Sequence, residues 1–169
     1  MKTIVITSGY FNPIHPWHIE CLELCKELWD ELWVVVNNDI QAKLKTGKET
    51  FQDEGFRLKV VSSIKPVNEV FLSVDEDGSV CNSIREVAKL IKEKHWDVKI
   101  IFWKWWDRFA WNVPEVEVCK EIIPKRGSIR KTFWKFWKKR KRFRKKCTGT
   151  REKKKIFRWN VWQGNSRTT

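Results

Sequence analysis

Glycine is scarce in this chain, with seven in 169 residues and only four of them before residue 122. Globular proteins average about 7% glycine, so turn positions that need this residue are under-supplied. Long apolar runs are also lacking, and none reaches the roughly 20 residues that a membrane-spanning helix needs. The apolar run near the N-terminus is too short for a secretion signal. We therefore expect a cytoplasmic protein with no membrane span.

Paired cysteines are missing as well. None of the five cysteines forms a CxxC pair, the spacing typical of zinc sites and redox centres. Cys21 and Cys25 lie four residues apart on a predicted helix, which is too few ligands for zinc. We expect reduced thiols in or near the core and no metal site built from protein side chains alone.

Acidic residues nearly vanish after residue 121. The first 121 residues hold 16 Lys and Arg against 20 Asp and Glu, whereas residues 122–169 hold 19 basic residues against Glu152 alone. We therefore predict a folded domain over residues 1–124 and a basic, aromatic tail over residues 125–169. Three interpretations of the tail remain open: a frameshifted remnant of the true C-terminus, a segment that binds nucleic acid or an anionic membrane surface, or a passive disordered tail.

Apolar runs and helical stripes alternate along the first 124 residues. Continuous β-branched or apolar runs predict strands at 2–7, 31–36, 67–73 and 98–102. Helices are predicted at 18–28, 53–64, 79–95 and 114–120, with a lysine-rich polar connection at 37–48. This alternation favours an α/β, Rossmann-like fold, a parallel sheet with helices on both faces. Ligands of such sheets bind beyond the carboxyl ends of the strands.

The stretch Thr7–His18, TSGYFNPIHPWH, joins the first strand to the first helix. It resembles the G-x-F-D-P-x-H-x-G-H motif of the cytidylyltransferase-like nucleotidyltransferases. Three shorter stretches extend the resemblance: Val34–Asp39, Lys104–Arg108 and Asn112–Lys120. Relatives have GGDR where this chain has Lys104–Arg108. The resemblance covers residues 2–121 and is closest to heptose-phosphate adenylyltransferase-like proteins.

Within this motif, two histidines stand three residues apart where the loop enters the helix. His15 and His18 can therefore direct two N–H donors at one triphosphate, aided by the helix N-terminus. Asn12 stands where the family has Asp, which keeps hydrogen bonding but loses the charge. Arg57, on the second predicted helix (53–64), is interpreted as structural.

The resemblance implies transfer of AMP or CMP from a nucleoside triphosphate to a phosphorylated sugar or polyol, with release of pyrophosphate and with Mg²⁺ accompanying the triphosphate. Its implied catalytic residues are His15, His18 and Lys45. The implied nucleotide-binding residues are Thr7, Ser8, Gly9, Tyr10, Phe11, Trp17, Lys43, Trp105, Trp106, Asp107 and Arg108, and the implied acceptor-binding residues are Asn12 and Asp39. Homodimerisation is left open. The competing interpretation is a nucleic-acid-binding protein that acts through its tail, with an inert α/β domain.

About seven of the twelve tryptophans stand where glycine is expected. Trp17, Trp105 and Trp106 occupy family glycine positions, and Trp29 and Trp96 follow predicted helices where a glycine cap is natural. The remaining unusual positions are Trp103 and Trp111, in the loop expected to approach the nucleotide. Our hypothesis is that the source organism reads UGA as glycine and that the chain was translated with UGA as tryptophan. The rival interpretation is a chain with genuine tryptophans that has lost activity.

Overall fold

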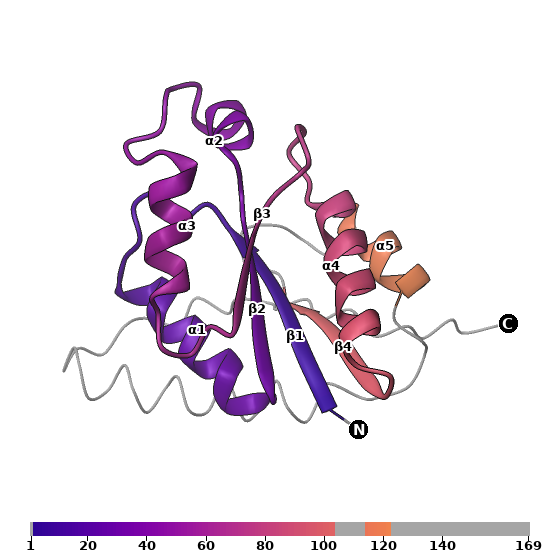
Figure 1. The fold of residues 1–169 in the computed structure, drawn as a ribbon. Helices are drawn as coiled ribbons and strands as arrows, with labels where there is room; N and C mark the ends of the chain where they lie inside the picture. The colour runs from indigo at the N-terminus through magenta and orange to yellow at the C-terminus, as the bar shows by residue number, and fades with distance from the viewer. Residues whose placement is uncertain (1, 104–113, 123–169) are drawn as a thin grey trace, which may run out of the picture.

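The computed structural model describes residues 2–103 and 114–122, which form one parallel sheet with helices on both faces (Figure 1). All four strands run parallel, in the order β3-β2-β1-β4. The elements are β1 (Lys2–Gly9), α1 (Pro16–Leu28), β2 (Glu31–Val36), α2 (Asp39–Thr46), α3 (Glu54–Ser62), β3 (Glu69–Leu72), α4 (Cys81–Lys94), β4 (Val98–Trp103) and α5 (Glu115–Ile122). The predicted α/β, Rossmann-like class is therefore confirmed.

Alternate residues of the central strand pack into two separate cores. Val5 of β1 belongs to the core under α1 and α3, whereas Ile4 and Ile6 belong to the core under α4 and α5. The side chains of successive strand residues point to opposite faces, and both faces are apolar here. The near-continuous apolar run of β1 therefore reflects a strand that is buried on both sides.

Helix α2 corrects one expectation from the sequence. The segment after β2 was expected to be a polar connection, but Asp39–Thr46 forms a helix beyond the carboxyl end of β2 (Figure 1). The Asn38 side chain accepts a hydrogen bond from the Gln41 N–H at 2.9 Å, and Gly47, with φ of 70°, ends the helix. Because only Gln41 and Ala42 are buried, the helix carries no apolar stripe that would have revealed it.

The other predicted helices and strands are confirmed with small shifts at their ends. The third strand is shorter than predicted, Glu69–Leu72 against 67–73. Helix α4 begins at Cys81, where the Asp75 carboxylate accepts hydrogen bonds from the backbone N–H groups of Asn82 and Ser83, both at 2.9 Å. This capping group lies six residues before the helix, so helical periodicity alone could not locate the start.

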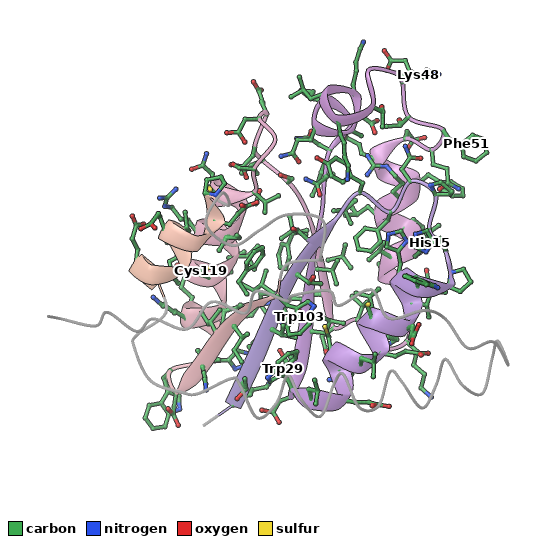
Figure 2. The ribbon with its side chains drawn as sticks, turned by 180° about the vertical axis from the view of Figure 1, so that it is seen from behind. His15, Trp29, Lys48, Phe51, Trp103 and Cys119 are labelled. Atoms are coloured by element: carbon green, nitrogen blue, oxygen red, sulfur yellow. The ribbon has the colours of Figure 1, made fainter. Side chains whose placement is uncertain are left out.

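Two tryptophans placed at expected glycine caps do not have the glycine backbone conformation. Trp29 follows α1 with φ of −138°, an extended conformation that any residue adopts. Among the non-glycine residues that the structure describes, only Phe11 has positive φ, so Trp96 also lacks it. Trp29 instead packs against Trp103, with ring centroids 5.6 Å apart (Figure 2). The conformational argument for glycine therefore fails at Trp29 and Trp96.

Over residues 2–103 and 114–122, no helix combines the length and the apolar character needed to cross a membrane. The cysteines in these ranges, Cys21, Cys25, Cys81 and Cys119, are free thiols.

Candidate functional site

The loop from β1 to α1 has a tightly specified shape. Phe11 adopts φ of 49°, which costs an aromatic residue on the order of 1–3 kcal/mol and persists only where the surroundings hold it. Its ring is buried beneath Gly9, where an added Cβ would lie 2.9 Å from Phe11 Cζ. Gly9 is therefore required by close packing, and the peptide bond between Asn12 and Pro13 is cis.

The two motif histidines lie together at the N-terminus of α1. His15 precedes the first residue of the helix, Pro16, and its ring stacks on the His18 ring with centroids 3.7 Å apart. The His18 Nδ1 atom accepts a hydrogen bond from the His15 backbone N–H at 3.2 Å. A neutral imidazole that accepts at Nδ1 carries its proton on Nε2. The helix therefore fixes the tautomer of His18.

The environment keeps His18 neutral. Burial, followed by the charges of His15 and Lys45, lowers the pKa of His18 from 6.5 to about 4. The Phe11 ring lies 5.1 Å from the His18 ring and supplies part of the apolar surroundings. At neutral pH, His18 is thus an uncharged donor at Nε2 beside a helix N-terminus, where backbone N–H groups also favour anions.

Helix α2 brings one of its two candidate lysines to this site. The Lys45 ammonium lies 4.3 Å from the centroid of the Tyr10 ring, and its charge contributes to the lowered pKa of His18. Lys43, in contrast, forms an exposed ion pair with Glu49, which raises the pKa of Lys43. The sequence analysis placed both lysines in a loop. In the structure both lie on helix α2, where Lys45 contacts the Tyr10 ring and Lys43 pairs with Glu49.

The remaining loop residues differ in what they can offer a ligand. Thr7 is fully buried in β1, and its hydroxyl donates to the Trp103 carbonyl at 2.9 Å. Ser8 is buried in the same strand. The Asn12 Oδ1 atom is buried and has no hydrogen-bond partner in the described part of the chain. Trp17 is the second residue of α1 and is 42% exposed.

A buried arginine, interpreted from the sequence as structural, connects the segments around the site. Arg57 donates to the Tyr10 and Asn37 carbonyls and pairs with Asp39 at 2.6 Å. Hydrogen bonds to Asp39 from Arg57, Glu54 N–H and Thr50 offset its desolvation and hold its pKa below the usual value. Asp39 thus joins this network while its side chain stays 35% exposed, and its role at the acceptor stays a prediction. The sequence did not predict this network because its acceptors are mainly main-chain carbonyls, which every residue has.

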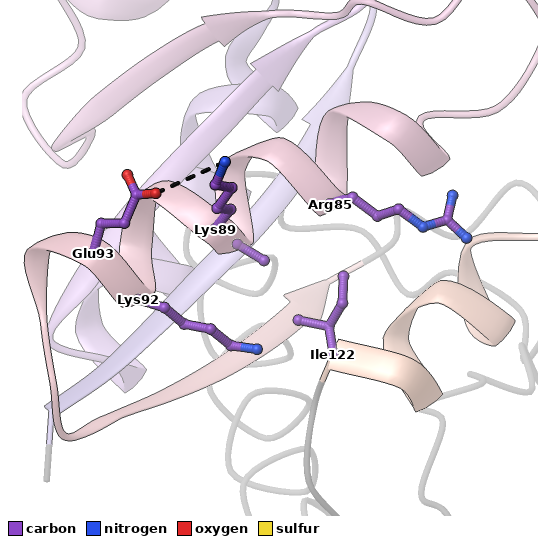
Figure 3. Close-up of a pocket in the computed structure, with 6 residues that line it drawn as sticks. Arg85, Lys89, Lys92, Glu93 and Ile122 are labelled. Atoms are coloured by element: carbon purple, nitrogen blue, oxygen red, sulfur yellow. Dashed lines mark ion pairs between the residues drawn. The ribbon is translucent and has the colours of Figure 1, made fainter.

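Other expected site residues lie outside the described residues. These are Trp105, Trp106, Asp107 and Arg108, together with the whole predicted tail, so their roles and the domain boundary at 124 stay predictions. A hollow lined by Arg85, Lys92 and Ile122 lies between α4 and α5 (Figure 3). It lies on the face opposite α1 and does not include the histidines.

A magnesium ion at this site would need substrate phosphates for most of its ligands. Among the side chains that the structure places, no three His, Cys, Asp or Glu residues gather into a metal site. Mg²⁺ typically enters with substrate phosphates and uses few protein oxygens. The buried, unpartnered Oδ1 of Asn12 fits such a limited role.

Comparison with known proteins shows the family to which the chain belongs. Residues 6–153 match the family model described as cytidylyltransferase-like. Proteins named FAD synthase are similar: one from Thermoplasma acidophilum is 45% identical over 43% of this chain and 51% of its own length. Another, from Methanocorpusculum labreanum, is 31% identical over 73% of this chain and 81% of its own length. A third, from Archaeoglobus profundus, is 34% identical over 56% of this chain and 61% of its own length.

The match thus spans about half of the first of these relatives and about four fifths of the second. A solved structure of a lipopolysaccharide core biosynthesis protein from Thermoplasma volcanium aligns with a TM-score of 0.48 and 29% identity, covering 60% of this chain and 96% of that one. The family match covers most of the chain and includes the loop between β1 and α1 that carries His15. The chain belongs to the cytidylyltransferase-like family.

Proposed function

We propose that this protein is a nucleotidyltransferase that moves a nucleotidyl group from a nucleoside triphosphate to a phosphate monoester. An oxygen of the acceptor phosphate attacks the α-phosphorus, the bond from that phosphorus to the bridging oxygen of the β-phosphate breaks, and pyrophosphate leaves. One observation carries the proposal: His18 is held neutral, with its donor at Nε2, at the N-terminus of α1 beside His15 and Lys45. Such donors stabilise charge that develops on phosphate oxygens.

The residues of the loop and α2 have separate tasks in this reaction. His15 and His18 donate hydrogen bonds to the triphosphate, and the backbone N–H groups at the start of α1 add to the same anion site. Lys45 supplies positive charge from the side of α2. Asn12 Oδ1 is the atom that would contact Mg²⁺ or one of its waters. When bound with the triphosphate, Mg²⁺ screens the phosphate charge.

We further propose ATP as the donor and flavin mononucleotide as the acceptor. The support is that the relatives from three archaea carry the name FAD synthase, and FAD consists of an AMP unit joined to flavin mononucleotide. Flavin mononucleotide carries its phosphate on a ribityl chain. It is therefore a phosphorylated polyol in this respect, which falls within the acceptor class implied by the family resemblance.

The test is a pyrophosphate-release assay of the full chain with ATP or CTP, each combined with flavin mononucleotide, a heptose phosphate or glycerol phosphate. We expect release with ATP and flavin mononucleotide and none with riboflavin, which lacks the attacking phosphate. Calorimetry with each triphosphate separates binding from turnover. The nucleotidyltransferase proposal is wrong if neither this chain nor a variant with glycine at positions 17, 105 and 106 binds any triphosphate. Release with a heptose phosphate alone would overturn the flavin assignment.

A further inference from the structure

The guanidinium of Arg57 is completely buried, and each of its three nitrogens is used. Nε donates to the Gln52 carbonyl at 3.0 Å, and Nη1 donates to the carbonyls of Tyr10 at 2.8 Å and Asn37 at 2.6 Å. Nη2 donates to Asp39 Oδ1 at 2.6 Å. One side chain of α3 therefore contacts the loop after β1, the end of β2, the start of α2 and the segment just before α3.

These contacts reach the site from two directions. Tyr10 directly precedes Phe11, whose positive φ requires the loop to be held from outside. Asp39 is the first residue of α2, the helix that carries Lys45. The Lys45 ammonium in turn lies 4.3 Å from the centroid of the Tyr10 ring, so Tyr10 is held at its carbonyl and supports Lys45 at its ring.

We propose that Arg57 is a positioning residue, which fixes the β1–α1 loop and helix α2 in the arrangement that places the Lys45 ammonium over the Tyr10 ring of the loop that carries the histidines. The proposal rests on the proposed function, because it assigns Arg57 to the geometry of that same site. Arg57 itself is buried under the loop and acts through Tyr10 and Asp39.

Stability alone does not explain the choice of arginine at this position. Burial of a charged pair is costly, and well-packed apolar residues of similar volume often stabilise a fold as well or better. What arginine provides is a rigid, planar set of five donors that can address several acceptors at fixed angles. Lysine keeps the charge opposite Asp39 but cannot make the same directed bonds to three carbonyls.

The experiment measures the pKa of His18 by NMR titration of its ring in the full chain, beside circular dichroism as a check of folding. In Arg57→Lys we expect a folded protein whose His18 pKa rises from about 4 towards 6.5, because His18 loses burial and part of the effect of the Lys45 charge. Lys45→Ala gives the part of the shift that comes from that charge. The matched control is Lys59→Ala, which removes an exposed cation from the same helix and leaves the His18 pKa unchanged.

The same variants report on the reaction. In Arg57→Lys we expect kcat to fall about 100-fold, since small misplacements of catalytic groups cost that much, while KM for ATP changes only a few-fold. If the role of Arg57 were purely structural, the variant would give less folded protein, and the folded fraction would keep the kcat of the wild type. The proposal is overturned if folded Arg57→Lys keeps both the His18 pKa and kcat of the wild type.

A second variant keeps the test decisive if Arg57→Lys does not fold. Asp39→Asn retains an acceptor for Arg57 and leaves the three carbonyl contacts intact, but it removes the charge that holds α2. We expect a partial rise of the His18 pKa, and an unchanged value overturns the proposal. Absence of pyrophosphate release by the wild type would count against the proposed function alone, because the His18 titration needs no substrate.

Discussion

The backbone N–H of His15 donates to Nδ1 of His18 at 3.2 Å, so the first turn of α1 orients the second histidine of the motif. This contact uses the acceptor nitrogen of a neutral ring and leaves Nε2–H as the donor for a ligand. The stacked His15 ring, with its centroid 3.7 Å away, restricts rotation of the His18 side chain. His15 therefore orients His18, in addition to the phosphate-binding role that the motif predicts for both histidines.

Removing the His18 ring should reduce turnover far more than it reduces stability. We expect His18→Ala to lower kcat by about 10²–10³-fold, the usual effect of losing one preorganised donor to a developing anion. The measurement is steady-state pyrophosphate release with ATP and the accepted phosphate monoester. His95→Ala is the control, because His95 lies after α4 near Glu31, at the amino end of the sheet. An equal loss in both variants would contradict the assignment.

Acid should destabilise the fold through His18. Its folded pKa of about 4 lies below the ordinary value of 6.5, so the unfolded chain binds more protons between these two values. The free energy of unfolding should therefore fall as the pH drops from 6.5 towards 4. Urea unfolding at several pH values measures this change, and His18→Ala should show a flatter profile there.

The carboxylates of Asp39 and Glu31 contribute at the acid end of the same range, and comparison with His18→Ala removes their contribution because both proteins carry them. Their folded pKa values are lowered from 3.8 and 4.5, so their stabilisation is lost only as the pH falls through and below those values. Wild type and His18→Ala with parallel profiles between pH 6.5 and 4 would show that His18 titrates normally.

The two candidate lysines of α2 should differ in their effects. We expect Lys45→Ala to raise the His18 pKa and to lower kcat/KM at least ten-fold, since it removes the charge beside Tyr10 and His18. Lys43→Ala removes only an exposed pair with Glu49 and should change kcat/KM less than three-fold, because that pair is screened by solvent. NMR titration and initial rates compare them. A larger effect from Lys43 would reverse the assignment.

Trp17 provides a direct test of the glycine hypothesis. We expect Trp17→Gly to increase ATP affinity at least ten-fold by calorimetry, because the indole on the first turn of α1 competes for space with the triphosphate. The cost in stability should be about 1 kcal/mol, the penalty for glycine in a helix. Trp96→Gly is the control: Trp96 is fully exposed after α4, so affinity should not change. Unchanged affinity in Trp17→Gly would favour a genuine tryptophan there.

The sequence predicted the buried framework well because that framework depends on side-chain type. The run at 31–36 is apolar throughout and forms β2 over Glu31–Val36 as predicted. Helix α4 was predicted from its apolar stripe, and Ile84, Val87 and Ile91 of that stripe are buried. Such patterns survive because burial of apolar surface is the dominant favourable term in folding.

The sequence did not reveal features that depend on the backbone or on distant partners. Helix α2 lacks an apolar stripe, although Asn38 before it and Gly47 after it are capping residues that could have indicated a helix. The contacts of Arg57 go mainly to main-chain carbonyls, which every residue has. The effect of the Lys45 charge on His18 depends on how α2 packs against the loop, which no local pattern encodes.

Because Arg57 donates to carbonyl oxygens at positions 10, 37 and 52, its hold on the main chain does not depend on which side chains stand at those positions. Only Asp39 must keep its chemical identity for the network to remain complete. Exposed side chains of these segments can therefore change while a single internal residue preserves the course of the main chain. A scaffold of this kind is suited to acquiring new acceptors by exchange of side chains alone.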